Sequence, residues 1–175
     1  MSQETAAPQG SDVLGAFAAQ ARVQGQKAAA EAWQLMTFLV AGTRFAVRVD
    51  AVRIVAPMPR VAAVPGTPPW LLGVANHRGE IVPVVDLARL LGLPGARAET
   101  SPFVLIALCD TVPTGIGCSI DALLDIVTVP ADALQPPIPT LQGPLARFAQ
   151  GTVHLGADLV TLLHLGRLAD VGAEA

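Results

Sequence analysis

The sequence predicts a mainly β protein, a barrel or sandwich built from two similar lobes, and three observations support this prediction. The segment 73–91 is echoed at 151–169, where five of 19 positions are identical when the two are aligned without a gap. Short apolar stretches follow one another at regular intervals, as strands do in barrels and sandwiches. The 16 Gly and 15 Pro residues break up these stretches, so only short helices are expected after the N-terminal region. A module used twice favours two lobes over one enzymatic cleft.

Composition excludes several classes of protein. Hydrophobic residues make up 52% and charged residues 14% of the chain, so we expect a large core and apolar surface that is either left exposed or covered by a partner. The net charge of -3 argues against nucleic-acid binding, and the lack of Tyr argues against a base-stacking surface. No apolar run is long enough to cross a membrane, and the first residues do not resemble a secretory signal. We therefore expect a cytoplasmic protein with reduced cysteines.

The chain is expected to consist of an N-terminal extension, residues 1–31, and one domain of two intimately packed lobes, residues 32–171. Residues 1–10 show no apolar period and are expected to be disordered. Ser11–Ala32 is rich in Ala and Gln and has apolar residues at helical spacing, which predicts a marginal helix ahead of the domain.

From Trp33 the apolar period changes to two, which predicts strands. Asp50 and Asp121 each precede a short apolar run and are expected to cap short helical turns, at 51–56 and 121–126. The first strand is apolar on both faces, as in a central strand, and the second alternates apolar and charged residues. Strands are expected at residues 35–40, 45–49, 60–64, 71–75, 81–85, 103–108 and 114–120.

The strongest local pattern is the tip of the hairpin between the strands at 71–75 and 81–85. Gly79 can take the positive φ that fixes a turn, and Asn76 can hydrogen-bond its own backbone. Between them, Arg78 presents five donors on a planar head. The simplest interpretation is a surface turn in which Arg78 pairs with Glu80.

The residues around this hairpin have structural roles that the sequence indicates. Gly73 opens the echoed segment, and Pro83 removes a hydrogen bond from the second strand. That strand is therefore expected at a sheet edge or with a bulge at Pro83. Asp86 is expected to cap a helix at 87–91, which Gly92 ends.

The stretch 73–87 resembles the motif of the CheW family, the adaptor proteins of bacterial chemosensory arrays. The family pattern is Gly-hydrophobic-x-Asn-Leu-Arg-Gly-x-hydrophobic-hydrophobic-Pro-hydrophobic-hydrophobic-Asp-Leu. The resemblance extends over about residues 33–170, and within the family it is closest to PilI-type proteins, which serve twitching motility. The matching positions are Gly73, Asn76, Arg78, Gly79, Pro83, Asp86 and Leu87.

The resemblance implies a fold of two five-stranded SH3-like barrels and a non-enzymatic role without cofactor or metal. The implied partners are the regulatory domain of a CheA-like histidine kinase and the cytoplasmic tip of a methyl-accepting chemoreceptor, with recruitment to membrane-associated arrays. The resemblance implies a protein that neither binds nucleic acid nor inserts directly into a membrane. The partner-facing candidates are Asn76, His77, Arg78, Gly79, Glu80, Arg53 and Ile54.

Three positions depart from the family pattern. His77 stands where Leu is usual, which makes the turn more polar. Ile54, after Arg53, stands where Glu is usual, so Arg78 is expected to meet an acid on the partner instead of one on this chain. His164 replaces the usual Asp and is expected to cap the last helix poorly.

Two other functions are open at this point. A small β-barrel enzyme or ligand-binding domain would need convergent titratable groups, and the chain offers few of them. His77, His154 and His164 lack the spacing of metal ligands, and no Gly-x-Ser-x-Gly elbow occurs. The other alternative is a kinase regulatory domain acting in trans, since similar barrels occur there.

Overall fold

The computed structural model describes residues 32–95 and 101–172. The chain divides between Ala32 and Trp33 into two units, and the fold below is that of the second. The expected disorder of residues 1–10 and the expected helix lie outside the described residues, except that Ala32 begins a strand. None of the described helices is long and apolar enough to cross a membrane.

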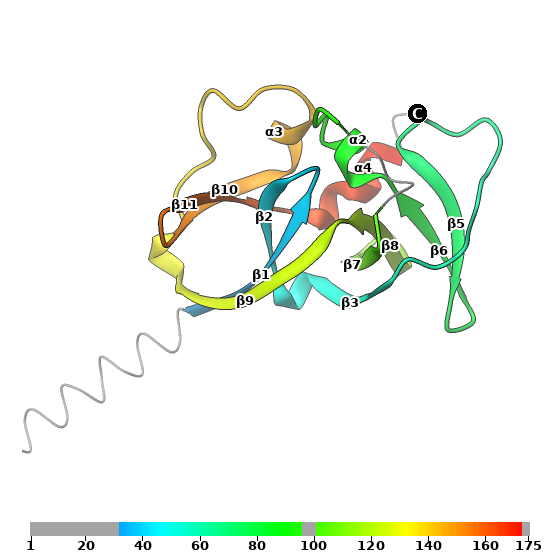
Figure 1. Cartoon of the computed structure of the whole chain (residues 1–175), viewed down its shortest axis with the longest axis horizontal. Coiled ribbons are helices and arrows are strands. Elements are labelled where there is room, and N and C mark those ends of the chain that lie inside the picture. Colours follow the sequence, from blue (N-terminus) through cyan, green and yellow to red (C-terminus); the bar gives the residue numbers. More distant parts are fainter. Residues whose placement is uncertain (1–31, 96–100, 173–175) are drawn as a thin grey trace, which may run out of the picture. The chain divides into compact units, whose positions relative to one another are not determined.

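Two sheets and a few short helices make up the second unit, which confirms the mainly β prediction (Figure 1). The helices are single turns that connect strands or end a hairpin. In chain order the elements are β1 (Ala32–Val40), β2 (Thr43–Arg48), η1 (Val49–Ala51), β3 (Val52–Pro57), β4 (Val61–Ala62), β5 (Leu71–His77), β6 (Glu80–Val85), α2 (Leu87–Leu90), β7 (Phe103–Cys109), β8 (Val112–Ile120), β9 (Ala122–Pro130), η3 (Ala131–Ala133), α3 (Pro144–Phe148), β10 (Ala149–Leu155), β11 (Asp158–Leu163), η4 (Leu165–Arg167) and α4 (Leu168–Gly172).

Each sheet forms one lobe. The two lobes exchange strands, which means that the strand after each of the pairs β1–β2 and β7–β8 joins the sheet of the other lobe. We call the five-stranded sheet β10-β11-β2-β1-β9 the Arg44 lobe and the six-stranded sheet β3-β7-β8-β6-β5-β4 the Arg78 lobe. Apart from the two-residue strand β4, the two orders correspond strand for strand. Strand β3 follows β2 in the chain but pairs with β7, while β9 follows β8 but pairs with β1. The Arg78 lobe is therefore the continuous run β3–β8, and the Arg44 lobe combines β1 and β2 with β9–β11.

The echoed segments form equivalent hairpins. A register shift precedes Gly73 in the β5–β6 hairpin, and the same shift precedes Gly151 in the β10–β11 hairpin. The second strand of each hairpin then pairs in parallel with a strand of its own lobe, Val84 with Gly117 and Leu162 with Ala46. The internal repeat of the sequence is thus a repeat of structure.

Three apolar clusters hold the lobes. One lies inside each sheet, around Val84 in the Arg78 lobe and Leu162 in the Arg44 lobe. The third and largest takes the neighbouring residues Val85 and Leu163 and includes side chains from both lobes. Successive strand residues point to opposite faces of a sheet. One face of each hairpin therefore contributes side chains to the interior of its own lobe, and the other face contributes side chains to the shared core. The shared core explains why the two lobes pack intimately.

Two elements expected as helical turns are strands. Residues 52–57 form β3 and residues 122–130 form β9, each an edge strand of the opposite lobe. An aspartate before a short apolar run matches a helix start, but pairing with a distant strand satisfies the backbone of these segments instead.

The expectations around the first hairpin are confirmed at Asp86 and wrong at Pro83. The Asp86 carboxylate accepts a hydrogen bond from the Arg89 backbone N at 3.0 Å, and Gly92 follows with φ of 69°. Strand β6, in contrast, lies between β8 and β5 rather than at an edge, and the bulge falls on β5. Pro83 is tolerated there because the parallel pairing with β8 begins only at Val84. His164 makes no side-chain cap on η4, as predicted.

Candidate functional site

The tip of the β5–β6 hairpin is a two-residue turn. His77 pairs with Glu80, which leaves Arg78 and Gly79 as the loop, with φ values of 53° and 89°. Positive φ at both positions is what a tight hairpin turn of type I′ requires. The Gly79 backbone N donates a hydrogen bond to Asn76 Oδ1 at 2.9 Å, which fixes the turn.

Arg78 occupies a backbone conformation that favours Gly or Asn. A left-handed conformation costs a non-glycine residue roughly 1–2 kcal/mol. Such strain at a non-glycine residue supports the hypothesis that the Arg78 side chain makes a functional contact. Among the described residues, the exposed Arg78 guanidinium takes part in no ion pair or hydrogen bond.

Glu80 is occupied by a different arginine. Arg53 Nη2 lies 2.8 Å from Glu80 Oε2, and Arg53 Nη1 donates to the Thr114 carbonyl at 3.2 Å. The expected pairing of Arg78 with Glu80 is therefore wrong, because β3 brings Arg53 to the carboxylate first. The ion pair joins β3 to β6 across two intervening strands, which shows that the sheet curls into a barrel.

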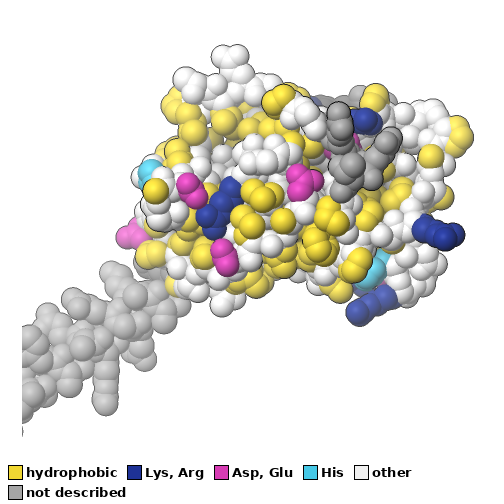
Figure 2. Space-filling view, viewed as in Figure 1, with side chains coloured by type: hydrophobic (Ala, Val, Ile, Leu, Met, Phe, Trp, Pro, Cys, Tyr) yellow, Lys and Arg dark blue, Asp and Glu magenta, His cyan; other side chains and the backbone are white. Residues whose placement is uncertain are grey.

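Five of the predicted partner-facing residues line one shallow depression of about 100 Å³: Arg53, Ile54, His77, Arg78 and Glu80. We call this depression and the adjoining turn the Arg78 corner. Two arginines against one glutamate leave it with a net positive charge, and Ile54 adds an apolar wall. Figure 2 shows Lys/Arg and His side chains gathered over this end of the molecule. Asn76 and Gly79, the two other candidates, form the turn.

The residues predicted to have structural roles, Gly73, Pro83 and Asp86, lie away from the corner. A Cβ at Gly73 would lie 2.0 Å from the Ala62 carbonyl oxygen, so only glycine lets β4 approach β5 here. Asp86 is fully buried, and its Oδ2 lies 3.2 Å from Arg89 Nε as well as capping α2. Pro83 faces Val74 within the hairpin. None of the three lines the depression at the Arg78 corner.

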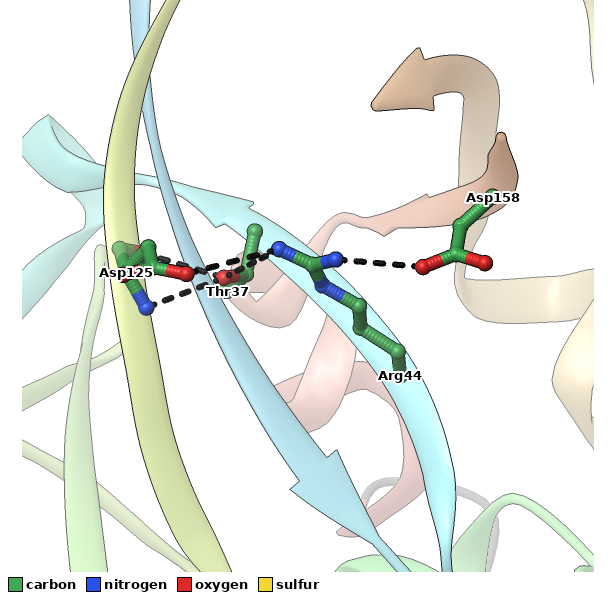
Figure 3. A network of polar contacts seen from close by, with 4 residues as sticks. All are labelled: Thr37, Arg44, Asp125 and Asp158. Carbon is green, nitrogen blue, oxygen red and sulfur yellow. Dashed lines mark hydrogen bonds and ion pairs between the residues drawn. The ribbon is translucent and has the colours of Figure 1, made fainter. Parts of the chain in front are cut away.

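The Arg44 lobe holds an arginine, Arg44, that is paired within the chain, in contrast to Arg78. The sequence alone does not indicate this role. Arg44 Nη1 lies 3.3 Å from Asp158 Oδ2, and Nη2 lies 3.7 Å from Asp125 Oδ2 and 3.4 Å from Thr37 Oγ1 (Figure 3). The buried Thr37 hydroxyl also bonds the Asp125 backbone. Arg44 thus ties β9 and β11 to the centre of its lobe through both terminal nitrogens, although its buried Nε has no hydrogen-bond partner among the described residues.

The described residues offer little for covalent or metal chemistry. Burial raises the pKa of the Cys118 thiol to about 12, so it is protonated and unreactive at neutral pH. Both cysteines are free thiols. Within the ranges that the structure covers, no three His, Cys, Asp or Glu side chains come together as metal ligands.

The chain is a mainly β protein of the two-barrel class. Its two barrels exchange strands, and an arginine at one hairpin tip has no partner among the described residues. The chain belongs to the CheW-like domain family, whose model matches residues 34–172. It is 30% identical to the "Probable chemotaxis protein CheW" of Rhizobium etli over 77% of this chain and 86% of that protein. It is 28% identical to "Protein PilI" of Pseudomonas aeruginosa, covering 77% and 74%.

A solved structure shows the same fold. The scaffolding protein TtCheW from Thermoanaerobacter tengcongensis superposes with a TM-score of 0.70 at 20% sequence identity. The match covers 78% of this chain and 91% of that one. The family predicted from the sequence motif is therefore confirmed, and so is the fold that the resemblance implied.

Proposed function

We propose that this chain is a non-catalytic scaffold adaptor that couples chemoreceptors to a CheA-type histidine kinase. The observation that carries the proposal is the Arg78 corner, where an exposed cation has no partner among the residues that the structure describes, on a member of the CheW-like family. The pathway would be chemotaxis or the twitching motility of type IV pili, since the relatives include both a CheW and a PilI. The proposed location is the cytoplasm, at membrane-associated receptor arrays.

The corner would act by orienting a partner rather than by chemistry. Arg78 would form a charge-assisted hydrogen bond with a carboxylate of the kinase regulatory domain or of the chemoreceptor tip. Arg53, Ile54, His77 and Glu80 would surround that contact, while Asn76 and Gly79 would hold the turn. The exposed apolar side chains of Ile81 and Leu159, 59% and 46% accessible, would add buried area on the two hairpins. The proposed domain boundaries are residues 32–171, with residues 1–31 as an extension.

The proposal is tested by reconstitution with purified fragments. We expect the full chain to form complexes with a chemoreceptor cytoplasmic fragment and with a CheA-type regulatory domain in analytical size-exclusion chromatography. A chain that bound neither fragment would contradict the proposal. A thermal-shift screen against a metabolite panel tests the alternative of a ligand-binding barrel, which ligand-specific stabilisation would favour.

A further inference from the structure

The two strand exchanges create two equivalent junctions between the lobes. At one, β8 ends and the chain crosses at Asp121 into β9; at the other, β2 ends and the chain crosses near Asp50 into β3. We call them the Asp121 junction and the Asp50 junction. The correspondence follows from the strand pairing, because Ala46 and Gly117 hold the same place beside Leu162 and Val84. Four residues further along the chain lie Asp50 and Asp121, just past the ends of β2 and β8.

The same counting matches the turns that face these aspartates. Thr37 pairs with Ala46, and Ile106 pairs with Gly117. Four residues after Thr37 and Ile106 come Ala41 and Asp110, which therefore occupy equivalent turns.

The Asp121 junction is sealed by its aspartate. Asp121 Oδ2 accepts a hydrogen bond from the Ala41 backbone N at 2.7 Å, and Oδ1 accepts one from Ser101 Oγ at 3.0 Å. The buried Ser119 hydroxyl accepts a hydrogen bond from the Leu87 backbone N at 3.2 Å. These bonds satisfy both carboxylate oxygens of Asp121 within the chain.

The Asp50 junction is open. Both oxygens of Asp50 turn to Arg48, one of them 3.0 Å from Arg48 Nε, instead of facing the β7–β8 turn. The hydrogen bond with Arg48 lowers the pKa of Asp50, so this pair stays charged at neutral pH. His164 stands here where the other copy has the capping Asp86. A cavity of about 290 Å³ remains, lined by Arg48, Asp50, Cys109, Asp110, His164 and Leu165.

The chemistry of this cavity favours a cation on an apolar stem. Arg48 and Asp50 neutralise each other, whereas the Asp110 carboxylate has no hydrogen bond or ion pair with any described residue. With His164 counted as neutral, the lining carries one net negative charge. Leu108, Leu163 and Leu165 supply apolar wall, as the methylene stem of Arg or Lys requires.

The size of the cavity limits what can enter. Pockets for drug-sized small molecules span roughly 300–1,000 Å³, so about 290 Å³ lies at the lower limit and suits a single long side chain. We propose that the Asp50 junction receives an arginine or lysine side chain of a protein partner, with Asp110 as its counter-ion. This docking point is separate from the Arg78 corner and has the opposite charge.

The test is an NMR titration of the ¹⁵N-labelled full chain with Nα-acetyl-L-arginine amide, with the glutamine and glutamate analogues as neutral and acidic controls. We expect saturable shifts at Asp110, Leu165 and Gly166 with the arginine probe only. Asp110→Asn should weaken binding at least fivefold, whereas Asp132→Asn, an exposed acid outside the cavity, should leave it unchanged. Both aspartates are exposed, so both variants are expected to fold like the wild type.

Three results would overturn the proposal. The arginine probe could cause no saturable shift, or Asp110→Asn could bind it as the wild type does. Free spermidine could also occupy the cavity through Asp110 at lower concentration than the arginine probe. That last result would assign the site to a free polyamine rather than to a protein side chain.

Discussion

The two hairpins of this chain share a fold but use their arginines differently. Each hairpin ends in an acid at the equivalent position, Glu80 or Asp158, and each acid binds an arginine from another strand. Beside Asp158 the Arg44 guanidinium pairs with two aspartates, whereas beside Glu80 a second arginine, Arg78, has no partner among the described residues. The comparison teaches that the repeat keeps the packing positions and the acid of each hairpin, whereas the arginines that bind these acids come from non-equivalent strands, β2 and β3, and the turns differ. Within the described part of the chain, an unpaired cation is the feature that separates the proposed docking corner from the tip of the other hairpin.

The largest expected effect concerns the interior positions that the duplication preserved. Leu162 is fully buried inside the Arg44 lobe, at the position that the smaller Val84 holds in the other lobe. Leu162→Ala should cost about 2–5 kcal/mol of unfolding free energy, because it leaves a cavity in the packed interior of the lobe. Urea unfolding measures the loss, and Val84→Ala is expected to cost less. Equal or reversed costs would show that the two interiors are not packed alike.

The second prediction concerns the helix cap, which is present at Asp86 in one copy and missing at His164 in the other. Asp86→Ala should destabilise the fold by about 0.5–2 kcal/mol because it removes the cap of α2. His164→Asp should stabilise the fold by up to about 1 kcal/mol, since it supplies the cap that η4 lacks. Thermal unfolding of both variants measures the opposite shifts. A loss of stability in His164→Asp would mean that the histidine makes a contact worth more than the cap.

The smallest expected difference separates the two bracing arginines. Arg44→Met should cost about 1 kcal/mol, because Arg44 is mostly buried and its removal leaves the Thr37 and Asp125 contacts incomplete. Arg53→Met should cost at most about 0.5 kcal/mol, because the Arg53 side chain is more exposed than that of Arg44, 39% against 26%, and its ion pair lies at the surface. Chemical denaturation of the two variants compares them, and a larger cost for Arg53→Met would reverse the account of the two tips.

Much of the fold follows from the sequence because its decisive patterns are local. Strand alternation, the internal repeat and the motif from Gly73 to Leu87 together indicate two lobes and the β5–β6 hairpin. The capping role of Asp86 also follows from its place before a short apolar run. These features depend on residues that lie close together in the chain.

The misses share one cause, which is pairing between distant segments. Strands β3 and β9 resemble helical turns locally, and only their exchange between lobes makes them strands. The sequence suggests Arg78, two residues away, as the partner of Glu80, because no local pattern places Arg53 beside that carboxylate. The cavity at the Asp50 junction is likewise invisible until the strand pairing aligns Asp50 with Asp121.

The central claim is that Arg78 binds a partner and contributes little to the fold. The most direct measurement is the affinity of the wild type, Arg78→Glu and Arg60→Glu for the chemoreceptor fragment and the kinase regulatory domain, with the melting temperature of each variant. Arg60 is exposed on the same lobe and lies outside the Arg78 depression, so it controls for charge reversal. We predict at least tenfold weaker binding of one partner for Arg78→Glu, about 1.4 kcal/mol, with a melting temperature near that of the wild type. Unchanged affinity for both partners, or an equal loss in Arg60→Glu, would contradict the claim.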